Sequence, residues 1–170
     1  HLSGKDRDPK KAMAAFEKGC AMGSARACDS AGFLALNGLA GPKDAARALK
    51  MYVKGCEGGD FGACTNAGFL YAGGGGAGVQ RDDQKALQYA SRACFGGNAT
   101  ACGNAGYKVE LGQSVAANPK MALTLYERAC RLDPGQCFRA GLFLSVGAAG
   151  VPKNEAKAKA MLEKACQLGT

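Results

Sequence analysis

The sequence has no histidine after His1 and no tryptophan. Without an internal imidazole, Ser-His and Cys-His nucleophiles and histidine-rich metal sites are excluded. The S-x-x-K and K-T-G motifs of serine hydrolases that open β-lactam rings are also missing. A run of about 18 apolar residues, the minimum for a membrane-spanning helix, does not occur, so we expect no transmembrane segment. These absences argue against an enzyme and against a bound cofactor.

What the chain does contain is a recurring phrase with two cysteines. Residues 18–28 read KGCAMGSARAC and residues 54–64 read KGCEGGDFGAC, and altered versions follow at 92–102 and 128–137. The first cysteines of these phrases stand at 20, 56, 94, 130 and 166, which gives steps of 36 to 38 residues. Such a period is typical of stacked helical repeats, in which one unit cannot bury its apolar face alone.

We therefore expect a single repeat array over residues 1–170. Its full units cover 8–43, 44–81, 82–117 and 118–153, and 154–170 forms a half unit or a capping helix. Residues 1–7 read as the tail of a preceding unit or as a linker. The sequence does not begin with a basic and then apolar leader, so we expect His1 to mark a processing boundary or a cut in a longer chain.

Each unit carries the start and stop signals of two helices. Side chains that cap helix N-termini precede the first helix at Asp8, Asp44, Asp82, Asn118 and Asn154, and the second at Ser24, Asp60, Asn98 and Asp133. Glycines that end helices follow at Gly23, Gly59 and Gly97, and at Gly38, Gly74, Gly112 and Gly147. The pattern predicts an all-α fold of antiparallel helix pairs.

A glycine recurs inside each second helix. The triplet Ala31-Gly32-Phe33 returns at 67–69, 105–107 and 140–142 with phenylalanine, tyrosine or leucine in third place. A glycine inside a helix costs about 1 kcal/mol relative to alanine. Four of them in register therefore predict a close approach between neighbouring helices.

The paired cysteines lie on either side of the tight turn between the two helices of a unit. This position can bring their Cα atoms within the roughly 6 Å that a disulfide needs. The predicted pairs are Cys20 with Cys28, Cys56 with Cys64, Cys94 with Cys102, and Cys130 with Cys137. Zinc ligation by cysteines of neighbouring units and a catalytic dithiol are alternatives, although C-x-x-C spacing is absent. Cys166 has no partner in this scheme, so it is free or pairs outside the sequence.

The [KR]-[GA]-C-x7-C phrase, the alanine-glycine pair and the roughly 36-residue period resemble Sel1-like repeat proteins, and among them the Helicobacter cysteine-rich proteins. The resemblance spans the chain from Asp8 to Gly169. It implies a right-handed α-solenoid whose helix pairs are cross-linked by disulfides and which is exported. Members of that group are described as penicillin-binding or weakly β-lactamase-active, whereas Sel1-like repeats more broadly act as adaptors in protein complexes. A mitochondrial relative, an assembly factor of the intermembrane space, is similar too.

Cations occupy nine of the ten positions that lie two or nine residues before a first cysteine, the exception being Met121. They are Lys11, Lys18, Arg47, Lys54, Lys85, Arg92, Arg128, Lys157 and Lys164, and we call them the basic stripe. Two helix positions seven apart share a face, which here points away from the cysteine. The stripe is either an ordinary solvated face or a surface for an acidic polypeptide. Disulfides are rare where most RNA resides, which argues against nucleic acid.

From the sequence we expect a non-enzymatic scaffold that binds a protein or peptide, with an acidic partner as one possibility that the net charge of +8 favours. No cofactor or metal is expected. Disulfides persist in oxidising compartments, so we expect a secreted or periplasmic protein, with the mitochondrial intermembrane space as the alternative. Penicillin hydrolysis and respiratory-complex assembly remain alternative functions implied by the resemblance.

Overall fold

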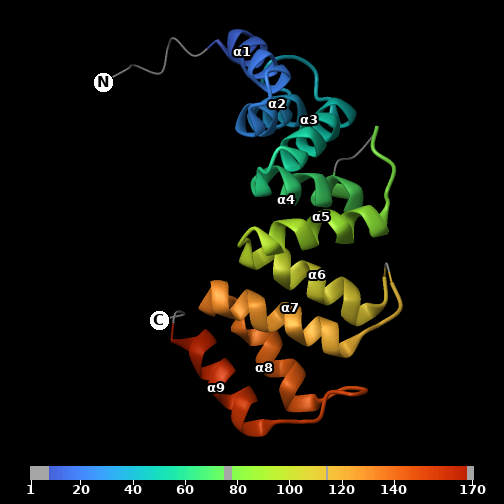
Figure 1. The fold of residues 1–170 in the computed structure, drawn as a ribbon, viewed down its shortest axis with the longest axis vertical. Coiled ribbons are helices and arrows are strands. Elements are labelled where there is room, and N and C mark those ends of the chain that lie inside the picture. The colour runs from blue at the N-terminus through green and yellow to red at the C-terminus, as the bar shows by residue number, and fades with distance from the viewer. Residues whose placement is uncertain (1–7, 75–77, 114, 168–170) are drawn as a thin grey trace. The chain divides into compact units, whose positions relative to one another are not determined.

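The computed structural model describes residues 8–74, 78–113 and 115–167, and the predicted tail at 1–7 lies outside them. Figure 1 shows helices connected by turns and loops along the whole described chain. The first helices of the repeats are α1 (Pro9–Ala21), α3 (Ala45–Glu57), α5 (Asp83–Phe95), α7 (Pro119–Leu132) and α9 (Glu155–Cys166). The second helices are α2 (Ala25–Asn37), α4 (Phe61–Phe69), α6 (Ala99–Leu111) and α8 (Cys137–Val146). The all-α solenoid of helix pairs expected from the sequence is confirmed.

The chain divides into two compact units, His1–Tyr89 and Ala90–Thr170. The first unit contains α1 to α4 and the start of α5, and the second contains the end of α5 and α6 to α9. In each unit the core consists mainly of alanine and cysteine, with a few larger side chains such as Tyr52 and Tyr126.

The predicted N-caps are confirmed in all five first helices. The side chains of Asp8, Asp44, Asp82, Asn118 and Asn154 each accept a hydrogen bond from a backbone N–H in the first turn of the helix that follows. Ser24, Asp60 and Asn98 do the same for α2, α4 and α6. The turn glycines Gly23, Gly59 and Gly97 have φ values of 92°, 93° and 94°, where a side chain would be strained.

Two helix boundaries differ from the prediction. The second helix of the second repeat ends as an α-helix at Phe69 and continues as a π-helical turn, Leu70–Gly74, in which Gly73 already leaves helical geometry at a φ of 99°. In the fourth repeat, Asp133 caps a short 3-10 turn, Pro134–Gln136, and α8 begins only at Cys137. Proline at the first position of this turn supplies no N–H, and the cysteines of this repeat are one residue closer together.

The recurring glycines make room for a large side chain of the next first helix. A Cβ built on Gly32 would lie 2.6 Å from the ring of Tyr52, and one on Gly106 would lie 2.8 Å from the ring of Tyr126. On Gly141 the nearest atom would be Cγ of Leu162, at 2.7 Å. At these three glycines the close approach expected from the sequence is therefore a contact with a bulky side chain four residues before a first cysteine.

One disulfide joins the two helices of each hairpin, four in all, in the pairing predicted from the sequence. The Cα atoms lie 4.6 Å apart in the first two pairs, Cys20–Cys28 and Cys56–Cys64, and 4.5 Å and 4.2 Å apart in Cys94–Cys102 and Cys130–Cys137. Closing a loop of about nine residues contributes roughly 2–3 kcal/mol of stability per cross-link in the chain-entropy model. Of the described cysteines, Cys166 lies outside any disulfide and is exposed.

Alkylation of the denatured, unreduced protein tests this pairing. With nine cysteines in the sequence and Cys166 outside a disulfide, we expect one tag before reduction and nine after it, counted by intact mass. Nine tags before reduction, in protein purified from an oxidising compartment, would contradict the pairing.

The glycine contact is tested by Gly32→Ala, with Gly41→Ala as its control, because nothing lies within 4 Å of a Cβ at Gly41. Alanine gains up to about 1 kcal/mol of helix propensity, but forcing a methyl group against a buried ring typically costs about 1–3 kcal/mol. We expect Gly32→Ala to lower the free energy of unfolding in urea and Gly41→Ala to leave it nearly unchanged. Equal or higher stability of Gly32→Ala would show that Tyr52 moves aside without cost.

Candidate protein-binding face

The second helices carry few charged residues and most of the exposed large apolar side chains. Helix α4 contains no charged residue, α8 contains only Arg139, and α2 and α6 contain two each. Most exposed large apolar side chains are nevertheless on these helices. We call them the second-helix face: Phe33, Phe61 and Phe69 in the first unit, and Tyr107, Leu111, Phe138, Leu142 and Val146 in the second.

In the first unit, the second-helix face contains exposed phenylalanines and a partly buried hydrogen bond between two polar side chains. Phe33 and Phe69 are each more than half exposed and follow the glycine of their helix. Next to them, Asn66 donates a hydrogen bond from Nδ2 to Oδ1 of Asp29 at 2.9 Å. Burial raises the pKa of Asp29, the bond from Asn66 lowers it, and the charge of Asp60 raises it further. The Asn66 amide thus links α4 to α2 through this hydrogen bond.

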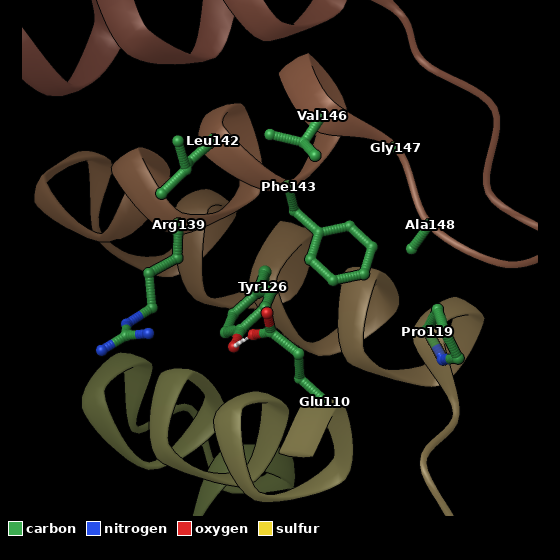
Figure 2. Close-up of a pocket in the computed structure, with 9 residues that line it drawn as sticks. All are labelled: Glu110, Pro119, Tyr126, Arg139, Leu142, Phe143, Val146, Gly147 and Ala148. Carbon is green, nitrogen blue, oxygen red and sulfur yellow. Dashed lines mark hydrogen bonds between the residues drawn. The ribbon is translucent and has the colours of Figure 1, made fainter.

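In the second unit, the face contains a pocket of about 370 Å³, which we call the α6–α8 pocket. Figure 2 shows Leu142, Phe143 and Val146 of α8 on one side and Glu110 of α6 on the other, with Tyr126 of α7 between them. The volume falls within the range of small-ligand and side-chain pockets. Phe138, Leu142 and Val146 are four residues apart along α8, so they form one exposed apolar stripe.

Tyr126 connects the pocket to the repeat packing below it. Its ring lies against Gly106 and is 6.0 Å from the ring of Phe143, and its hydroxyl donates to Oε2 of Glu110 at 2.5 Å (Figure 2). Burial raises the pKa of Tyr126, and the hydrogen bond and charge of Glu110 raise it further, against a smaller opposite effect of Arg139. The hydroxyl therefore stays protonated at neutral pH and holds the Glu110 carboxylate in place.

The charge of the basic stripe is partly compensated. At the position nine before the cysteine, Lys11 pairs with Asp8 at 4.0 Å, Lys85 with Asp82 at 3.4 Å and Lys157 with Glu127 at 2.7 Å. Arg47 forms an ion pair with Glu17, thirty residues earlier. These cations connect a first helix to its own cap or to the preceding repeat.

The position two before the cysteine lies in the last turn of each first helix, where a cation is favoured by the helix dipole. Lys18, Lys54, Arg92 and Lys164 are exposed there. Arg128 instead donates to the backbone oxygens of Cys94 and Phe95, at 3.3 Å and 3.2 Å, and its guanidinium lies 5.3 Å from the centroid of the Phe95 ring. Arg128 thereby caps the end of α5.

The second-helix face was missed in the sequence, where the triplets were interpreted only as packing. The signal was the third residue, which is large and apolar in every repeat although it stands next to a buried glycine. Successive residues on a helix point about 100° apart, so both cannot face the same neighbour. Within the described ranges, no three His, Cys, Asp or Glu side chains gather as metal ligands, and no helix is long and apolar enough to cross a membrane.

Disulfide-linked antiparallel helix pairs, packed through a glycine of α2, α6 and α8, define a helical repeat protein of the solenoid class. The chain belongs to the Sel1 repeat family, whose model matches residues 1–24, 25–60, 62–98, 99–134 and 137–170. Four of these matched segments begin at or near the start of a second helix, one helix later than the units expected from the sequence. Sel1 repeats are generally non-catalytic scaffolds that mediate protein–protein interaction.

Solved structures with this fold include a protective antigen of uropathogenic Escherichia coli with an SLR fold, at 24% identity and a TM-score of 0.82 over 93% of this chain. A Sel1 repeat protein from Oxalobacter formigenes is 28% identical, with a TM-score of 0.84 over 95% of the chain. The cysteine-rich protein B of Helicobacter pylori is 28% identical over 78% of this chain and 94% of its own, with a TM-score of 0.57.

The chain spans 34% of the Escherichia coli structure and 65% of the Oxalobacter one. A search of curated proteins finds no match. The four disulfides and the likeness to a cysteine-rich Helicobacter protein are consistent with an oxidising compartment outside the cytoplasm.

The two buried tyrosines are tested by alkaline titration. Burial, and then the charge of Asp29, raises the pKa of Tyr52 to about 12, and that of Tyr126 is raised as well. Since the folded pKa exceeds the unfolded value of about 10, their contribution to stability is constant below pH 10 and is lost as the pH rises towards 12. Tyrosinate absorbance after a rapid pH jump should show Tyr52→Phe and Tyr126→Phe each losing signal from the most alkaline step. Loss from the step near pH 10 would contradict the burial of that ring.

Proposed function

We propose that the protein is a non-enzymatic scaffold that binds a protein or peptide partner on the second-helix face. The observation that carries this proposal is the concentration of exposed aromatic and aliphatic side chains on helices that are almost free of charge. Exposed apolar clusters with few charges are typical of the centres of protein interfaces, where aromatic residues are enriched and lysine and glutamate are depleted.

The scaffold works by rigid display of these side chains. Each hairpin is cross-linked by a disulfide, and Gly32, Gly106 and Gly141 fix the depth at which the next first helix packs. A partner therefore meets side chains that are already positioned, which reduces the entropy lost on binding. We place the protein in a secreted or periplasmic location, because disulfides persist there and are reduced in the cytosol.

The basic stripe is a second proposed contact surface, for acidic segments of the same partner. Its support is the exposure of Lys18 and Lys54 in the last turns of α1 and α3, together with the net charge of +8. Exposed cations of this kind mainly accelerate association and add little affinity. We therefore assign affinity to the second-helix face and steering to the stripe.

Peptides selected from a displayed library on the immobilised protein test the proposal. Their affinities should fall about tenfold or more with Phe33→Ser in the first unit or Leu142→Ser in the second, the size of effect expected when a central apolar contact is removed. The matched controls Lys50→Ser and Lys120→Ser alter exposed residues of first helices and should leave affinity unchanged.

Variants of the basic stripe are tested in the same experiment. Lys18→Ser and Lys54→Ser should lower the association rate and its dependence on salt, with little effect on dissociation. If the affinity falls in the lysine variants and is unchanged in Phe33→Ser and Leu142→Ser, the binding surface lies on the first helices instead. If selection yields no peptide that binds the folded, disulfide-intact protein, the scaffold function itself is contradicted.

A further inference from the structure

The α6–α8 pocket carries a cation at a repeat position where the other second helices have a neutral side chain. At the position two before the recurring glycine, the first three repeats have Ser30, Asn66 and Asn104, and the fourth has Arg139. Arg139 is exposed, and its guanidinium lies 4.7 Å from the centroid of the Tyr107 ring. The guanidinium also interacts with the Tyr126 hydroxyl, which opposes the burial that raises the pKa of Tyr126. Guanidinium has five N–H donors, so the remaining ones at its edge can bind a carboxylate through two parallel hydrogen bonds.

No carboxylate of the described residues forms an ion pair with Arg139. Glu110 is the acidic residue of the pocket, and its carboxylate accepts the hydroxyl hydrogen bond of Tyr126. In the view of Figure 2, Glu110 and Arg139 lie on either side of that hydroxyl. The pocket therefore has a fixed, hydrogen-bonded acid on one side and a cation without an ionic partner on the other.

The apolar wall adjoins this cation. Arg139, Leu142 and Val146 stand three and four residues apart on α8, so their side chains share one face and neighbouring Cβ atoms lie about 5–6 Å apart. Leu142 is 50% exposed and Val146 is 74% exposed, and Phe143 lies deeper, next to Tyr126. The volume of about 370 Å³ suits one large apolar side chain together with part of its backbone.

We propose that the α6–α8 pocket binds a short segment of an acidic protein partner, with a leucine- or phenylalanine-sized side chain against Leu142 and Phe143 and a neighbouring Asp or Glu carboxylate on Arg139. The inference rests on the proposed scaffold function and specifies the partner for this pocket. Charge complementarity selects the carboxylate, both at Arg139 and through the net charge of +8. A side-chain carboxylate is the source, because an acidic protein offers many of these and only one chain terminus.

The test uses the whole isotope-labelled protein and a set of peptides with acetylated and amidated ends, titrated by NMR. The lead peptide carries leucine and glutamate two residues apart. One relative has glutamine for the glutamate, another has alanine for the leucine, and a third has glutamine and a free carboxyl end. We expect the lead peptide to shift the amide signals of α8 around Arg139 and Leu142 and to bind about tenfold or more tightly than the glutamine peptide, as a charge-assisted pair predicts.

Variants separate the two parts of the pocket. Arg139→Gln should weaken the lead peptide about tenfold or more and abolish its advantage over the glutamine peptide, with partial recovery in Arg139→Lys. Leu142→Ala should weaken all leucine peptides and preserve the preference for glutamate. Arg131→Gln, which changes an exposed arginine of α7 outside the lining of the pocket, is the control and should bind as wild type.

Three results would overturn the inference. Equal affinity for glutamate and glutamine peptides, or an unchanged preference in Arg139→Gln, removes the carboxylate contact. If the peptide with the free carboxyl end binds more tightly than the lead peptide, Arg139 recognises a C-terminal carboxylate and not a side chain. Failure of the lead peptide to bind at millimolar concentration excludes this ligand, while library peptides that still bind through Phe33 or Leu142 would leave the scaffold function standing. Thiol counts and circular dichroism confirm that each variant is folded.

Discussion

The contact between a helical glycine and a bulky side chain of the next repeat is the constraint on which the rest of the structure depends. Gly32 receives Tyr52, Gly106 receives Tyr126 and Gly141 receives Leu162. The helices consequently pack through alanine, glycine and cysteine, so the cores contain few large side chains. Such cores bury little apolar area per residue, and the disulfides offset this by restricting the unfolded chain at each hairpin.

The same contact determines which side chains remain for a partner. When the glycine faces the next first helix, the residue after it is turned about 100° away and reaches solvent, as Phe33, Tyr107 and Leu142 do. Helices α3 and α7 each pack between two second helices, and some charged residues of the first helices pair with caps or with preceding repeats, as Arg47 does with Glu17. Packing thus leaves an apolar second-helix face and a first-helix surface whose charge is partly compensated.

The sequence was sufficient for the helix pairs, their caps and the disulfides, because these depend on residues within about ten positions of one another. The sequence was insufficient for contacts between side chains that lie about one repeat apart in the chain. Arg47 and Lys157 looked like members of an open basic stripe, and each pairs with a glutamate thirty residues earlier. The pocket was also out of reach, since Glu110, Tyr126 and Arg139 come from three helices and meet only through the packing of Tyr126 on Gly106. Local signals of this kind fix helices but not their surfaces.

Differences between repeats then give the array its chemical variety. In the first unit, Asn66 occupies the register of Arg139 and donates its amide to Asp29, so its polar capacity is used within the fold. In the second unit, Arg139 lies over Tyr107, and the carboxylate of Glu110 is held by a tyrosine that also belongs to the core. Asn66 uses its amide within the fold, whereas the five N–H donors of Arg139 exceed what the Tyr126 hydroxyl can accept, so a change from amide to guanidinium in this register adds donors for a partner. The repeat scaffold can therefore acquire specificity without any change in its packing, because the varying side chain stands two residues before the glycine, about 200° around the helix from it.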